Sequence, residues 1–200
     1  MANGQRFVLV LAPRFHHIYG MNGKLSYGFE TPAYSYAEVE TALARTLVVP
    51  AGHQRGALRA RLKHLQRLGL VDLKAGKGKR VKYNHAQVAQ WLLALIMAEM
   101  GLDPTIVVTS LKGSWKHIAS AVEEAIGPEA QRGGRPYYLC VWPRVMSGPW
   151  RQKPSLAISV EQLPDDELRN KIHSSRDDWF GIYNLTRALS HLDIVLPRRG

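Results

Sequence analysis

The sequence predicts an α+β protein, mainly α, with a second, smaller mixed α/β region after the helical part. Apolar residues recur every three or four positions through most of residues 36–122, which is the period of a helix with one buried face. Short β-prone runs lie near the N-terminus and between residues 137 and 160. Apolar residues make up 46% of the 200 residues and charged residues 22%, which excludes collagen-like, low-complexity and wholly disordered chains.

The first 34 residues predict a buried strand followed by a loop. Residues 6–12 are apolar and β-prone, and residues 13–34 contain several glycines and prolines. The apolar run is too short for a secretory signal, and no run approaches the roughly 18 residues that span a membrane. The single cysteine, Cys140, can form neither an internal disulfide nor a multi-cysteine metal site. We therefore expect a soluble cytoplasmic protein with no membrane partner.

Three helices are expected next, at residues 36–47, 53–68 and 85–100. Before the first helix, Ser35 and Glu38 have the spacing of a capping box. The second helix carries one apolar stripe, formed by Leu58, Leu62, Leu65 and Leu68. Gly69 is placed to end this helix in a left-handed cap, and Gly101 ends the third helix.

A short hairpin with a basic tip is expected between the second and third helices. Residues 71–73 are extended, and residues 74–83 combine glycines with several cations before a β-prone end. After the third helix, Asp103 is expected to cap a fourth helix that has Pro104 at its first position. This helix, or a successor, continues through Val122.

The remaining residues predict the mixed region. After a linker or long turn, the expected elements are strands at 137–142 and 156–160, a short helix at 164–171 and a last helix at 177–192. The acids Asp177 and Asp178 are expected to cap the last helix. The predicted organisation is a strand and loop at 1–34, a helical domain at 35–111, and a region at 112–200 that serves dimerisation or partner binding.

The net charge of +11 is concentrated in one segment. Residues 41–85 hold eleven of the 27 lysines and arginines and only one of the 16 acids, Asp72, so this segment carries a net charge of +10. A concentrated positive field attracts polyanions and speeds their encounter with the protein. Nucleic acid is the commonest such partner, and the alternatives are an anionic membrane surface or a merely solvated basic face.

The order of elements in residues 35–111 is that of a winged helix-turn-helix. Because the major groove admits one helix, the helix at 53–68 would turn its leucines inward and its cations toward base edges. The hairpin would lie on the flanking backbone, where its cations displace counterions. The expected DNA contacts from the helix are Gln54, Arg55, Arg59, Arg61, Lys63 and His64. Those from the wing, residues 74–83, are Lys77, Lys79, Arg80, Lys82 and Tyr83.

Residues 62–71, Leu-Lys-His-Leu-Gln-Arg-Leu-Gly-Leu-Val, resemble the end of the recognition segment of MerR-type regulators. The stretches 78–83, 84–88 and 98–104 also resemble that family, so the resemblance covers residues 36–111. It implies that Lys63 and His64 face DNA from the helix, that Arg80 and Tyr83 do so from the wing, and that the helices after the wing form a homodimer. Residues 112–200 do not match the family's effector-sensing ends.

The predicted function is sequence-specific binding of double-stranded DNA by a transcriptional regulator of bacterial or phage type. The expected partners are DNA, a second copy of the chain and RNA polymerase, and the expected location is the nucleoid. We expect no catalytic residue, no metal and no cofactor. The main alternative is an architectural or mobile-element DNA-binding protein, of the replication initiator or excisionase type.

A further alternative is an enzyme that the basic segment delivers to DNA. Asp165, Asp166 and Glu167 could hold a metal for DNA cleavage, although acids after Pro164 more simply form the first turn of a helix. The eight histidines lack the HxxxH and HExxH spacings of metal sites. Cys140 lies in an apolar, strand-like run, so we expect a buried structural thiol rather than a nucleophile.

Overall fold

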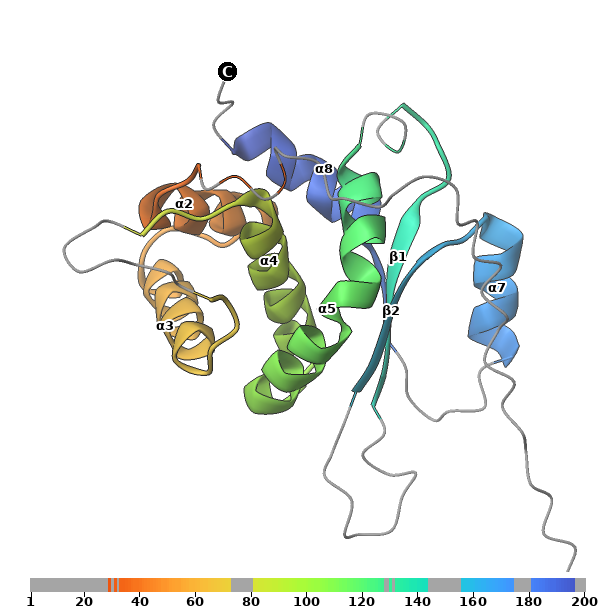
Figure 1. The fold of residues 1–200 in the computed structure, drawn as a ribbon, viewed down its shortest axis with the longest axis horizontal. Helices are drawn as coiled ribbons and strands as arrows, with labels where there is room; N and C mark the ends of the chain where they lie inside the picture. The colour runs from red at the N-terminus through yellow and green to blue at the C-terminus, as the bar shows by residue number, and fades with distance from the viewer. Residues whose placement is uncertain are drawn as a thin grey trace, which may run out of the picture.

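The computed structural model describes residues 29, 31, 33–72, 81–127, 130, 132–143, 156–174 and 181–196. Within these residues the protein is α+β and mainly helical, with six helices and one three-stranded antiparallel sheet (Figure 1). The predicted strand at 6–12 and most of the predicted loop at 13–34 lie outside the described residues.

Three helices form the half of the molecule that contains the cationic segment: α2 (Tyr36–Thr46), α3 (His53–Arg67) and α4 (His85–Glu99). The capping box that begins α2 is confirmed, because the Ser35 backbone N–H donates to Glu38 Oε2 at 2.7 Å and the Ser35 side chain accepts from the Glu38 backbone. Asn84 and Gln87 form the same arrangement at the start of α4. All three helices lie within a residue of their predicted bounds.

These three helices end in the same hydrogen-bonded motif, but with different residues. Gly69 after α3 and Gly101 after α4 have φ values of 80° and 82°, as the left-handed end requires. After α2 the left-handed position is occupied by Val48, at a φ of 52°. Its N–H donates to Arg45 O at 3.1 Å, and the next N–H, that of Val49, donates to Ala44 O at 2.8 Å. A β-branched residue in this conformation is strained, and Val48 is 82% exposed, so packing does not compensate.

The long helix α5 (Pro104–Ile126) connects the helical half to the sheet. Asp103 caps it as predicted, because its Oδ1 accepts from the Thr105 and Ile106 N–H groups at 2.8 and 3.2 Å. The helix runs without a break through residue 111, the last residue of the helical domain predicted at 35–111. One apolar core includes residues from α2, α3, α4, α5, the sheet and α8.

The sheet has the order β2-β1-β3, with β1 (Tyr137–Pro143) in the centre and β2 (Leu156–Gln162) and β3 (Gly181–Asn184) at its edges. Alternate residues of β1 face opposite sides, as expected for a strand. Leu139 and Val141 join the main core beneath α5 and α8 (Leu185–Val195), whereas Cys140 packs near Leu168 of α7 (Asp165–Ser174). Figure 1 shows α5 and α8 on one side of the sheet and α7 on the other.

The predicted helix at 177–192 is wrong over residues 181–184, and residues 177–180 lie outside the described residues. Residues 181–184 form the edge strand β3, which pairs with β1 through Ile182 opposite Cys140 and Tyr183 opposite Leu139. The helix starts afterwards, where the Asn184 side chain accepts a hydrogen bond from the Arg187 N–H at 2.9 Å. Asp177 and Asp178 lie outside the described residues. The predicted strands near 137 and 156 and the short helix near 164 are confirmed.

The residues that flank the predicted wing are attached to the helical half. Tyr83 pairs with Tyr34 in an isolated antiparallel bridge, with N–H to O distances of 2.8 and 2.9 Å. The Tyr83 ring lies 5.0 Å from that of the fully buried Trp91 of α4. Of the predicted strand at 71–73, residues 71 and 72 belong to no strand, and residue 73 lies outside the described part of the chain.

His85 lies where α4, α8 and the Tyr34–Tyr83 bridge meet. Its Nδ1 is 3.2 Å from the Tyr34 hydroxyl oxygen, and its Nε2 is 3.6 Å from Asp193 Oδ1 of α8. Burial lowers the pKa of His85, and the nearby Asp193 carboxylate opposes this shift only in part. The imidazole is therefore held in its neutral form at neutral pH.

We predict that Val48→Gly raises the free energy of unfolding by about 1 kcal/mol, because glycine adopts the left-handed conformation without strain. The matched control is Gly101→Ala, at the same position after α4, where a Cβ would meet nothing within 4 Å. This control should be destabilised by a similar amount. Equal stability of Val48→Gly and the wild type in urea unfolding would contradict the strain at Val48.

A second prediction concerns the pH dependence of stability. Since the folded-state pKa of His85 is lowered, the unfolded chain binds a proton more readily, and stability should fall as the pH falls. The contribution is fully present above the unfolded pKa of about 6.5 and is lost as the pH falls through the lower folded pKa. The free energy of unfolding of His85→Gln, measured in urea, should lack this loss of stability at low pH. If it depends on pH in the same way for the variant and the wild type, the role of His85 is refuted.

Candidate nucleic-acid interface

The helix α3 is held on the molecule by one face only. Its leucine stripe is confirmed, because Leu58, Leu62 and Leu65 are all buried in the main core, and Leu68 is partly buried against it. The helix lies beside α2 and α4 (Figure 1). Its remaining side chains are exposed or half-exposed, and it contains no acidic residue. This places most of the predicted helix contacts at the surface.

An ion pair ties α3 to α2. The guanidinium of Arg59 donates from Nε and Nη2 to the two carboxylate oxygens of Glu40, each at 2.9 Å. Glu40 is only 7% exposed, so it is a charged group that needs this partner. The hydrogen bonds to Glu40, and then its charge, raise the pKa of Arg59 above its ordinary value. The sequence predicts that Arg59 contacts DNA, but its Nε and Nη2 groups donate to Glu40 instead.

Arg61 makes a second ion pair on the opposite flank of α3. Its guanidinium pairs with Glu99 in the last turn of α4, and both side chains are more than half exposed. An exposed pair of this kind contributes little to stability. Because of this pair, Arg61 is not among the cations of α3 that lack an ion-pair partner. Two of the six predicted helix contacts therefore bridge α3 to its neighbours.

Two free cations of α3 lie on the face opposite its leucines. Lys63 and Arg67 are four residues apart and exposed, and neither forms an ion pair with any described residue. A shallow depression of about 650 Å³ beside them is lined by Ala60, Lys63, Gln66 and Arg67. Arg67 is absent from the predicted contacts, although its position four residues after Lys63 places it on the same face. We call Gly56, Ala60, Lys63 and Arg67 the outward face of α3.

The other predicted contacts fall into three groups. Gln54, His64 and Lys82 are exposed and Arg55 is half-exposed, so each is accessible. Tyr83 is 2% exposed and packs on Trp91, so it is a core residue and is not accessible to DNA. Lys77, Lys79 and Arg80 lie outside the described residues.

Asp72, which precedes the predicted wing, and Tyr83, its last residue, both lie at the N-terminal end of α4. On one side, Gln87 Nε2 of α4 donates to Asp72 O at 3.1 Å. On the other side, Tyr83 is fixed by its bridge to Tyr34, immediately before Asn84 caps α4. The described residues on either side of residues 73–80 are therefore fixed beside the same helix end.

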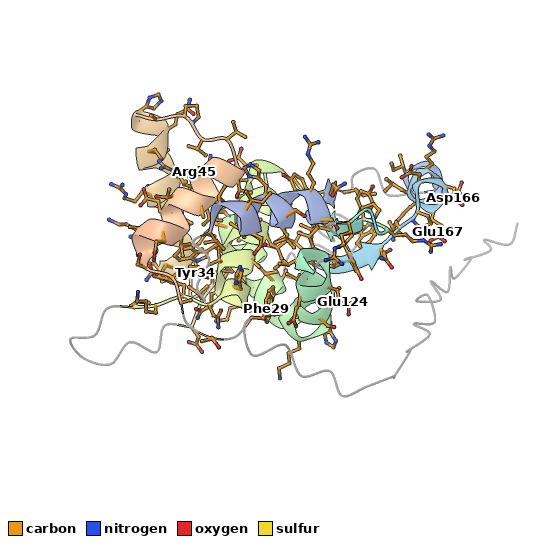
Figure 2. All side chains as sticks on the ribbon, turned by 90° about the horizontal axis from the view of Figure 1, so that it is seen from above. Phe29, Tyr34, Arg45, Glu124, Asp166 and Glu167 are labelled. Atoms are coloured by element: carbon orange, nitrogen blue, oxygen red, sulfur yellow. The ribbon has the colours of Figure 1, made fainter. Side chains whose placement is uncertain are left out.

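The residues considered for catalysis lie elsewhere. Asp165, Asp166 and Glu167 form the acidic first turn of α7. Figure 2 shows Asp166 and Glu167 at the end of the molecule opposite to Arg45 and the helical half. Within the described ranges, no three His, Cys, Asp or Glu residues are grouped as metal ligands would be. Burial, and next the charge of Glu161, raise the pKa of Cys140 to about 12, so its thiol is a poor nucleophile.

Comparison with known proteins assigns the chain to no family. No family model matches the chain, and no curated protein is significantly similar to it. None of the helices in the described part of the chain is long and apolar enough to cross a bilayer. The candidate interface therefore depends on the geometry and charge of α3 and its surroundings.

We predict that Arg59→Met lowers the melting temperature by several degrees, because it leaves the Glu40 carboxylate buried without its partner. The double variant Glu40→Gln/Arg59→Met removes that unpaired charge and should recover part of the loss. Thermal unfolding of the wild type, both single variants and the double variant forms a complete cycle. Additive losses would contradict the role of this pair in fixing α3.

Proposed function

We propose that this protein binds double-stranded DNA sequence-specifically as a winged helix-turn-helix transcriptional regulator. The observation that carries the proposal is the outward face of α3. It presents the free cations Lys63 and Arg67 on a helix whose opposite face is fixed in the core. This helix lies in the segment of residues 41–85, which has a net charge of +10.

The shape of this face suits the major groove. A single helix fits that groove, and long cationic side chains can reach guanine edges or the phosphates beside them. Ala60 and Gly56 lie between the cations and the N-terminus of α3 and are small and exposed, so they permit a close approach to DNA. His64 is exposed beside Lys63, and Gln54 and Arg55 are accessible in the first turn of α3, so these three side chains can add hydrogen bonds.

The wing would contribute contacts to the phosphate backbone. Its cations Lys77, Lys79, Arg80 and Lys82 follow α3 in the chain, and the described residues on either side of residues 73–80 are fixed beside the N-terminus of α4. Such contacts supply affinity and salt dependence rather than sequence preference. The order of α2, α3 and this segment along the chain is that of a winged helix-turn-helix, and this order supports the proposal.

A homodimer, with RNA polymerase as a further partner, remains part of the proposal. Regulators of this type commonly read two half-sites related by a twofold axis. The helices after the wing offer no obvious apolar seam in the described part of the chain. Helix α4 is almost entirely buried within the monomer, and the exposed residues of α5 are mostly polar. A dimer would therefore use another surface.

The test of the proposed function is the double variant Lys63→Ala/Arg67→Ala. Its binding to a mixed-sequence DNA duplex should fall, and the slope of log K against log salt should become shallower by about two, since two phosphate contacts are lost. The control Arg169→Ala/Arg187→Ala removes the same charge from exposed positions on α7 and α8. Equal salt slopes for the test and control variants would contradict a specific role of α3.

A further inference from the structure

The exposed surface of α5 is unusually free of negative charge. No acidic residue occurs between Asp103 and Glu123, which spans most of the helix. Its residues Thr109, Lys112, Gly113 and Lys116 are all exposed, and they recur with the spacing of one helix face. We call these four residues the α5 ridge. Neither lysine forms an ion pair with a described residue.

One lysine of the α5 ridge reaches the C-terminal end of α3. The Lys112 Nζ lies 3.6 Å from the position that a Cβ on Gly69 would occupy. Gly69 follows α3 directly and stands two residues after Arg67. A cation of α5, far away in the sequence, therefore lies beside the C-terminal end of the helix that carries Lys63 and Arg67. Like charges four residues apart on a helix repel each other weakly, and Lys112 and Lys116 have this spacing.

Gly113 is a second feature of the ridge that the fold does not explain. Most other described glycines have a positive φ or a backbone atom close to the Cβ position. Gly113 and Gly56 instead lie inside helices, and a Cβ on either would meet nothing within 4 Å. Glycine is a poorer helix former than alanine, so neither position favours it for stability. Both glycines stand next to cations, Arg55 in α3 and Lys112 in α5.

We infer that the α5 ridge binds the phosphate backbone of the DNA that α3 reads, in a second contact beyond the helix and the wing. This inference rests on the proposed function. Since the major groove admits one helix, α5 would meet the sugar-phosphate strand rather than base edges. Lysine ammonium groups and a threonine hydroxyl are donors that phosphate oxygens accept, and Gly113 lets the helix backbone approach the strand.

The experiment compares Lys112→Ala/Lys116→Ala with the charge-matched control Arg169→Ala/Arg187→Ala. The probe is a mixed-sequence DNA duplex, and the readout is affinity over a series of salt concentrations. The ridge variant should bind more weakly to all sequences alike, and its salt slope should be shallower than that of the wild type by about two. A slope that matches the control variant would overturn the inference, because only the overall charge would then matter.

Two further measurements separate this inference from the proposed function. Gly113→Ala changes no charge, and it should raise the melting temperature while weakening DNA binding several-fold. Unchanged binding by Gly113→Ala would overturn the close approach of α5. If Lys63→Ala/Arg67→Ala loses affinity while the ridge variant does not, the inference fails and the proposed function stands. If the wild type binds no DNA, both fail.

Discussion

The burial of Glu40 is the constraint on which the arrangement of the helical half depends. A carboxylate that is 7% exposed requires a partner, and the fork of Arg59 satisfies both of its oxygens at 2.9 Å. This contact fixes the rotation of α3 about its axis relative to α2, together with the three buried leucines. As a consequence, Lys63 and Arg67 point away from the core, with no acidic partner in the described part of the chain.

Local signals in the sequence predict most of the helices, because caps and apolar periodicity act within a few residues. Ser35, Gly69 and Asp103 each perform the predicted role at a helix end. Strand β3 is missed because its conformation depends on pairing with β1, whose paired residues lie 40 to 46 positions earlier in the chain. The contacts of Arg59 and Tyr83 are missed for the same reason. Arg59 pairs with Glu40 of α2 and Tyr83 packs on Trp91 of α4, and no local sequence pattern reveals these partners.

Contacts with other helices, which the sequence does not reveal, also distinguish the cations of the basic segment, residues 41–85, from one another. Charge alone makes Arg59, Arg61, Lys63 and Arg67 equivalent, but the first two form ion pairs and the last two form none with a described residue. Lys112 brings a further free cation to the end of α3 from a helix outside the basic segment. The acids that remain exposed on α7 lie at the opposite end of the molecule, so they do not neutralise this surface (Figure 2).

We propose that the outward face of α3 reads a DNA sequence. The most direct test is selection of bound fragments from sheared genomic DNA at about physiological salt, where weak non-specific binding is suppressed. The wild-type protein should enrich a shared motif, and Lys63→Ala/Arg67→Ala should enrich none. Binding by the wild type without an enriched motif, or the same motif recovered by both proteins, would contradict the claim.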